Sequence, residues 1–186
     1  MAHSSFLLRL LLMGVLSCLL PEAEARPVDF WCQPQIRAGW RASAVDMTDR
    51  MIDCQGEVAG PATQIQCPFV GINRLRWDNL TAIEKLSEVV SDLQVLQHGL
   101  EETHNQTVLN CQPLLKDITH HVKNSRIILQ RSLQNATMEA SLSPPQTCSG
   151  LSAALKRYEK LLQGKLELSV SGLCNKNTTD FISTGL

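Results

Sequence analysis

The stretch LLQGKLELSVSGLC, residues 161–174, is rich in leucine, has a glycine and a lysine at its centre, and stops at a cysteine. With the residues before it, it predicts a helix over about 151–170 with apolar side chains on one face. These side chains are Leu151, Leu155, Tyr158, Leu162 and Leu166. A glycine inside a helix costs about 1 kcal/mol relative to alanine. Gly164 therefore needs a reason, either close packing of a neighbouring segment or contact with a partner.

Three earlier segments have the same spacing of apolar residues, at about 34–54, 80–100 and 111–133. Like 151–170, each has about 20 residues and would be about 30 Å long. Thr81 and Glu84 have capping-box spacing at the start of the second segment. Few stretches alternate with a period of two, which argues against a large sheet. We expect an all-α protein with four main helices.

The connections between these helices predict the topology. The first connection, 55–79, and the third, 134–150, are long, whereas the second, 101–110, is short. A short connection forces neighbouring helices to run antiparallel. A chain that climbs back along a helix of about 30 Å needs about ten extended residues or more. The long–short–long order therefore predicts an up-up-down-down four-helix bundle with two long crossover loops, as in cytokines.

The cysteines fit this topology. There are seven, and Cys18 lies in an N-terminal segment that we expect to be removed, which leaves six. An even number in a secreted chain predicts a disulfide framework. In the predicted bundle the first helix begins where the fourth ends, and it ends where the third begins. The expected pairs are Cys32–Cys174, Cys54–Cys111 and, by elimination, Cys67–Cys148. An up-down-up-down bundle would also bring Cys32 and Cys174 together, so the connection lengths decide between the two topologies.

The N-terminus has the pattern of a secretory signal. Arg9 precedes an apolar run at 10–20, and residues 23–25 form an A-x-A cleavage pattern. We expect a signal peptide at 1–25, a four-helical domain at 26–174, a short flexible tail at 175–186, and secretion of a protein that does not insert into membranes. Sequons for N-glycosylation fit this location. They begin at Asn79, Asn105, Asn135 and Asn177.

Motifs for catalysis or cofactor binding are absent from the sequence. It has no phosphate-binding glycine loop, dinucleotide fingerprint or G-x-S-x-G elbow. His120 and His121 are the best metal candidates, but adjacent helical positions point about 100° apart and do not converge on one ion. The formal net charge of −1 gives no basic surplus for nucleic acid. We expect no enzyme activity, cofactor, metal or nucleic-acid partner.

Both ends of the predicted domain resemble the erythropoietin/thrombopoietin family. There the fourth helix has Arg-Gly-Lys, then an apolar run and a cysteine; here the triplet is Gln163-Gly164-Lys165, without the arginine. The segment RPVDFWCQPQI, 26–36, is similar to the start of the family, although glutamines replace charged residues near the cysteine. Trp77 resembles a tryptophan at the end of the first crossover. The resemblance covers nearly all of the expected mature chain, which begins at Arg26.

The resemblance implies a monomeric hormone that joins two copies of a single-pass cytokine receptor and activates JAK–STAT signalling. The expected partner is the thrombopoietin receptor, which controls megakaryocyte and platelet production; the erythropoietin receptor and red-cell production are the alternative. A high-affinity surface would use the fourth helix, the first helix and the end of the first crossover. A second surface would use the first and third helices. The residues expected on the high-affinity surface are Lys165, Gly164, Lys160, Arg157, Lys156, Arg37 and Arg41.

Two other classes remain open, a secreted carrier with a ligand inside the bundle and a secreted enzyme. A carrier would need a cavity, and dense leucine stripes argue against one. We expect Trp40 and Tyr158 in the core, and Phe69 and Trp77 exposed in the first crossover. An exposed Lys165 would give a simple outcome for Lys165→Glu, weaker receptor binding at an unchanged thermal midpoint.

Overall fold

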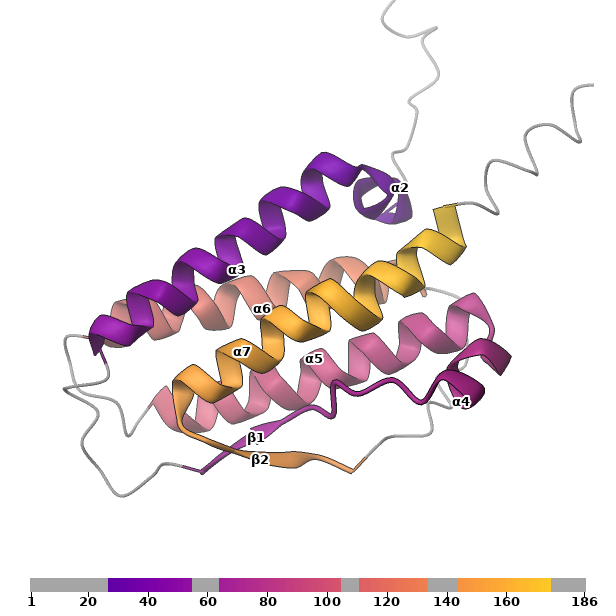
Figure 1. Ribbon diagram of the computed structural model, residues 1–186. Helices are drawn as coiled ribbons and strands as arrows, with labels where there is room; N and C mark the ends of the chain where they lie inside the picture. The colour runs from indigo at the N-terminus through magenta and orange to yellow at the C-terminus, as the bar shows by residue number, and fades with distance from the viewer. Residues whose placement is uncertain (1–26, 55–63, 105–110, 134–143, 175–186) are drawn as a thin grey trace, which may run out of the picture.

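The computed structural model describes residues 27–54, 64–104, 111–133 and 144–174 (Figure 1). The expected signal peptide, the C-terminal tail and the sequons at Asn105, Asn135 and Asn177 lie outside these ranges. Within them, no helix is both long enough and apolar enough to cross a membrane.

Four long helices make up the bundle. They are α3 (Pro34–Cys54), α5 (Ala82–His104), α6 (Gln112–Arg131) and a fourth helix that begins as α7 (Leu151–Leu161). Their ends lie within a few residues of the ranges predicted from apolar spacing. Two short helices add to them: α2 (Pro27–Cys32) precedes α3, and α4 (Arg74–Asn79) lies in the first crossover.

The helices run up, up, down and down. In Figure 1, α3 and α5 both start at the end of the bundle that holds α2 and α4, and α6 and α7 run back toward that end. α5 packs against α6, and α3 packs against α7. The fold class predicted from the connection lengths is therefore confirmed.

Reciprocal hydrogen bonds fix the start of α5. The amide of Thr81 donates to Glu84 Oε2 (2.7 Å), and the amide of Glu84 donates to Thr81 Oγ1 (3.2 Å). This is the capping box that the sequence predicts. The bonds to Thr81 also hold the pKa of Glu84 below its usual value. Two amides that the first helical turn leaves without partners are satisfied in this way.

A two-stranded ribbon, which no pattern in the sequence predicts, joins the two crossovers. β1 (Gln64–Cys67) pairs antiparallel with β2 (Gln146–Ser149). β1 also packs closely on α5 at Gly99, where an added Cβ would lie 2.4 Å from the carbonyl oxygen of Gln66. Only a residue without a side chain lets backbone approach so closely. The ribbon thus holds both crossovers against α5.

The fourth helix is interrupted by a π-helical turn, η1 (Leu162–Leu166), and continues as helix over 167–174. Its buried stripe has a spacing of four, at Tyr158, Leu162, Leu166 and Val170. In an α-helix each step of four residues drifts by about 40°, so three steps would turn the stripe by about 120°. The extra residue of a π turn cancels about 100° of this drift. The π turn therefore keeps both halves of the helix facing the core.

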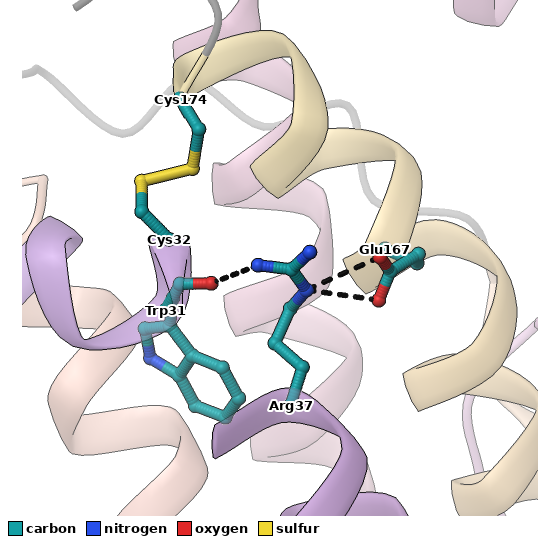
Figure 2. The surroundings of a disulfide bond; sticks show 5 residues. All are labelled: Trp31, Cys32, Arg37, Glu167 and Cys174. Carbon is teal, nitrogen blue, oxygen red and sulfur yellow. Dashed lines mark hydrogen bonds and ion pairs between the residues drawn. A yellow bond between two sulfur atoms is a disulfide. The ribbon is translucent and has the colours of Figure 1, made fainter. Parts of the chain in front are cut away.

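Two disulfides close the fold at the positions expected from the topology. Cys32 is bonded to Cys174, which joins the start of the bundle to the end of the fourth helix (Figure 2), and Cys67 is bonded to Cys148 across the ribbon. Cys111 is also disulfide-bonded. The side chain of Cys54 lies outside the described residues, so the Cys54–Cys111 pair stays a prediction. A bridge across 142 residues contributes roughly 5 kcal/mol in the chain-entropy model.

Candidate functional site

Lys165 is buried, and the expectation that it is exposed is wrong. Its side chain is 0% exposed, and it lies within η1. The ammonium Nζ lies 2.7 Å from Glu88 Oε1 and 2.8 Å from Asp92 Oδ2. It also donates to the carbonyl oxygen of Phe69 at 2.7 Å. Three acceptors thus replace the water that a buried ammonium loses.

Arg76 completes a cluster of four charges. Its Nη2 is paired with Glu88 Oε2, so Glu88 bridges the arginine of α4 and the lysine of the fourth helix. We call Arg76, Glu88, Asp92 and Lys165 the buried charge cluster, in which Arg76 lies at the edge with its side chain 42% exposed. The two cations and two carboxylates of the cluster balance. Burial raises the pKa of Asp92 to about 6, although the Lys165 ammonium opposes this shift. The cluster connects the first crossover, α5 and the fourth helix.

The cluster fixes the crossover against the fourth helix. Lys165 reaches the Phe69 carbonyl, and its ammonium lies 5.8 Å from the centre of the Phe69 ring. Beside it, a Cβ added to Gly164 would lie 4.0 Å from Ile72 Cδ1, which is ordinary van der Waals contact. The crossover therefore lies against Gly164, but its packing does not require a glycine there.

Some expected cations on the fourth helix are exposed and others hold the fold together. Lys156 and Lys160 are exposed. Arg157 is half-buried and donates from Nη1 to Gln146 Oε1 at 2.7 Å, which ties the helix to β2. Only the two lysines are therefore fully available to a partner.

Arg37 and Arg41 of α3 both bind Glu167 of the fourth helix. Arg37 Nε lies 3.1 Å from both carboxylate oxygens of Glu167, and Arg41 Nη1 lies 3.0 Å from Oε2. Figure 2 shows Arg37 beside the Cys32–Cys174 disulfide, with Nη1 donating to the Trp31 carbonyl. The Arg37 side chain is 13% exposed and that of Arg41 is 35% exposed. Arg41 is the more accessible of the two.

Exposed apolar side chains lie both in the first crossover and on the fourth helix. Phe69 is 37% exposed, as expected, whereas Trp77 is 6% exposed, so its expected exposure is wrong. Leu168 is 51% exposed and was not anticipated. It lies four residues after Gly164, which is the position beside Ile72 of the crossover. We call Phe69, Lys160, Gln163 and Leu168 the crossover–helix surface.

A buried polar network in the core was not anticipated either. Trp40 Nε1 donates to Ser125 Oγ (2.6 Å), and the Tyr158 hydroxyl lies 2.8 Å from both Ser125 Oγ and His121 Nδ1. Burial lowers the pKa of His121 to about 4 and raises the pKa of Tyr158 well above its usual value. All four groups are therefore neutral at pH 7, and the network joins α3, α6 and the fourth helix.

This network offers no route for catalysis. Ser125 is 0% exposed, so a substrate cannot reach its hydroxyl. Among the residues that the structure describes, no group of three histidine, cysteine or acidic side chains could hold a metal ion. His120 is exposed, whereas His121 belongs to the network. The two side chains do not converge.

The up-up-down-down bundle, closed by disulfides across its ends and crossovers, is the architecture of a helical cytokine. The chain belongs to the erythropoietin/thrombopoietin family, whose model matches residues 30–177. It is accordingly a signalling cytokine of blood-cell formation that binds a cytokine receptor, in a family of secreted proteins that are not enzymes. No curated protein sequence matches the chain.

Proposed function

We propose that the chain is a secreted, monomeric hormone that joins two copies of a single-pass cytokine receptor and activates the Janus kinases and STAT proteins behind them. The thrombopoietin receptor is the favoured partner, with platelet production as the outcome. Cys32-Gln33-Pro34 at the start of the first helix and Cys111 at the start of the third resemble thrombopoietin. The erythropoietin receptor is the alternative, because the spacing from Gly164 to Cys174 is closer to erythropoietin.

One observation supports a high-affinity surface more than any other. The buried charge cluster holds the crossover against the fourth helix, so that exposed side chains of both segments form one surface. The crossover–helix surface combines a phenylalanine, a leucine and a lysine, and protein interfaces typically have an apolar core enriched in aromatic side chains, with a polar rim. In this proposal Lys165 acts by positioning the crossover and does not itself contact the receptor. Lys156, Arg41 and the half-buried Arg157 would extend the surface.

A second, weaker surface would use α3 and α6. Val45 on α3 is 39% exposed, and Lys116 and Lys123 on α6 are exposed. None of these side chains belongs to the crossover–helix surface. The two surfaces share only α3, through Arg41, which would extend the first. One hormone can therefore offer each of two receptors a different face.

Receptor reporter cells test the proposal. One line carries the thrombopoietin receptor and a second carries the erythropoietin receptor, and the purified hormone is added to both. A response of the first line alone is expected. A response of the second alone would favour the alternative, and a response of neither would overturn both.

A matched pair of variants tests the surface. Leu168→Glu introduces a charge at the centre of the crossover–helix surface, and we expect receptor affinity to fall about 30-fold, as for a hot spot of about 2 kcal/mol. The control is Gln94→Glu, an exposed residue of α5 outside both proposed surfaces. Equal affinities of the two variants would show that the surface is wrongly placed. Circular dichroism confirms that both are folded.

A further inference from the structure

The corner formed by α4 exposes an apolar side chain. Leu75 is 83% exposed, more than any other large apolar side chain in the described ranges. The helix that holds it is only six residues long and is anchored by Trp77, which is 6% exposed. Leu75 therefore points away from the core while its helix is held in place.

Asn79 lies directly next to this leucine. It is the last residue of α4, four residues after Leu75, and residues four apart share a helical face. Its side-chain nitrogen Nδ2 donates to the carbonyl oxygen of Leu75 at 2.9 Å. Nδ2 is also the atom that carries the sugar in an N-linked glycan. Asn79, Leu80 and Thr81 form a sequon, and both Asn79 and Thr81 are exposed.

We propose that Asn79 carries an N-linked glycan whose first sugars lie over Leu75. Nδ2 forms a bond to C1 of an oligosaccharide carried on a lipid diphosphate, the bond from C1 to the diphosphate breaks, and one amide proton leaves. The glycosylated nitrogen keeps its second hydrogen and with it the bond to the Leu75 carbonyl. The bond fixes the orientation of the Asn79 amide, with C1 on the other side of Nδ2 from the Leu75 carbonyl. Because Leu75 and Asn79 share one face of α4, the first sugars are within reach of the leucine side chain, whose exposed surface their apolar face covers.

Glycan analysis tests the modification. The protein is secreted from a eukaryotic cell as wild type, as Asn79→Gln, and as Thr81→Ser. Thr81→Ser is the control, since serine keeps the sequon and the hydroxyl that accepts from the Glu84 amide. Mass spectrometry of the peptide that contains residue 79 should find a glycan in the wild type and the control only. An unmodified Asn79 in the wild type overturns the proposal.

Hydroxyl-radical footprinting tests where the sugar lies. Leu168, 51% exposed, serves as a reference within each sample. From exposure alone Leu75 should react faster than Leu168, as we expect for Asn79→Gln. In the glycosylated wild type and control this order should reverse. An order that stays the same in all three proteins overturns the placement of the glycan.

Enzymatic deglycosylation of the folded wild type guards against a folding defect of Asn79→Gln. The treated protein should also oxidise Leu75 faster than Leu168, at an unchanged Leu168 rate. Retention of the slow Leu75 reaction after the sugar is removed would show that protein atoms, and not sugars, protect the leucine. None of these measurements depends on which receptor the hormone binds.

Discussion

Removal of the Lys165 ammonium should destabilise the whole protein. In Lys165→Met the carboxylates of Glu88 and Asp92 keep Arg76 as their only cationic partner in the cluster. Their side chains are 7% and 8% exposed, so water does little to compensate. Loss of one partner of a buried ion pair costs about 3–5 kcal/mol. At this chain length that corresponds to a fall of about 10 °C in the thermal midpoint.

Urea and thermal unfolding of three variants measure this effect. Lys160→Met removes an exposed lysine of the same helix and should change the free energy of unfolding by no more than about 0.5 kcal/mol. Lys165→Met with Asp92→Asn restores the balance of charge and should recover much of the loss. The reasoning is refuted if Lys165→Met lowers the free energy of unfolding by less than about 1 kcal/mol, or if adding Asp92→Asn lowers it further.

Because Lys165 is buried, the expected result of Lys165→Glu differs from the one predicted from the sequence. An exposed lysine would give weaker receptor binding at an unchanged thermal midpoint. The structure instead places a third carboxylate among Glu88 and Asp92, so the midpoint should fall at least as far as in Lys165→Met. Any loss of receptor binding by this variant then has to be measured on the folded fraction alone.

Two further predictions concern pH and backbone packing. The pKa of Asp92 is raised to about 6 in the folded protein from 3.8, so its contribution to stability is fully present only below pH 3.8 and is lost as the pH rises through 6. The free energy of unfolding of the wild type and of Asp92→Asn should therefore be measured at pH 7, 6, 5 and 4. As the pH falls from 7 to 4, the free energy of the wild type should rise relative to that of Asp92→Asn by on the order of 2 kcal/mol. A difference independent of pH would contradict this. Gly99→Ala should cost about 1–3 kcal/mol, because its Cβ would lie 2.4 Å from the Gln66 carbonyl oxygen. Gly164→Ala is the matched control, since its Cβ would meet Ile72 at 4.0 Å, and this variant should gain up to about 1 kcal/mol from the higher helix propensity of alanine. Equal losses in the two alanine variants would show that the contact at Gly99 is not decisive.

Local sequence patterns were enough to predict the helices and their order. Apolar residues at helical spacing depend on one segment at a time, and the connection lengths constrain the topology through the geometric reach of the chain. The Cys32–Cys174 pair followed from that topology, and the Cys67–Cys148 pair was predicted by elimination. Thr81 and Glu84 marked the start of α5 because a capping box is also a local pattern.

The features that the sequence analysis missed depend on distant segments. Lys165 is buried because Asp92, 73 residues away, lies opposite it, and a lysine on a helix shows no sign of this by itself. One signal was present: Glu88 and Asp92 are four residues apart among the apolar positions of α5, where isolated carboxylates would be costly. The four-residue strands of the ribbon are too short for a period of two to be recognised.

The ribbon between the crossovers also sets the order in which the chain can be completed during synthesis. Cys67 and Cys148 are 81 residues apart, so β1 leaves the ribosome long before its partner strand exists. Until then its polar backbone edge and the surface of α5 beneath it stay open. Contacts between such distant segments form slowly. Final closure of the ribbon over α5 must therefore wait until residues 146–149 have been synthesised, and oxidation of this pair of thiols records that step.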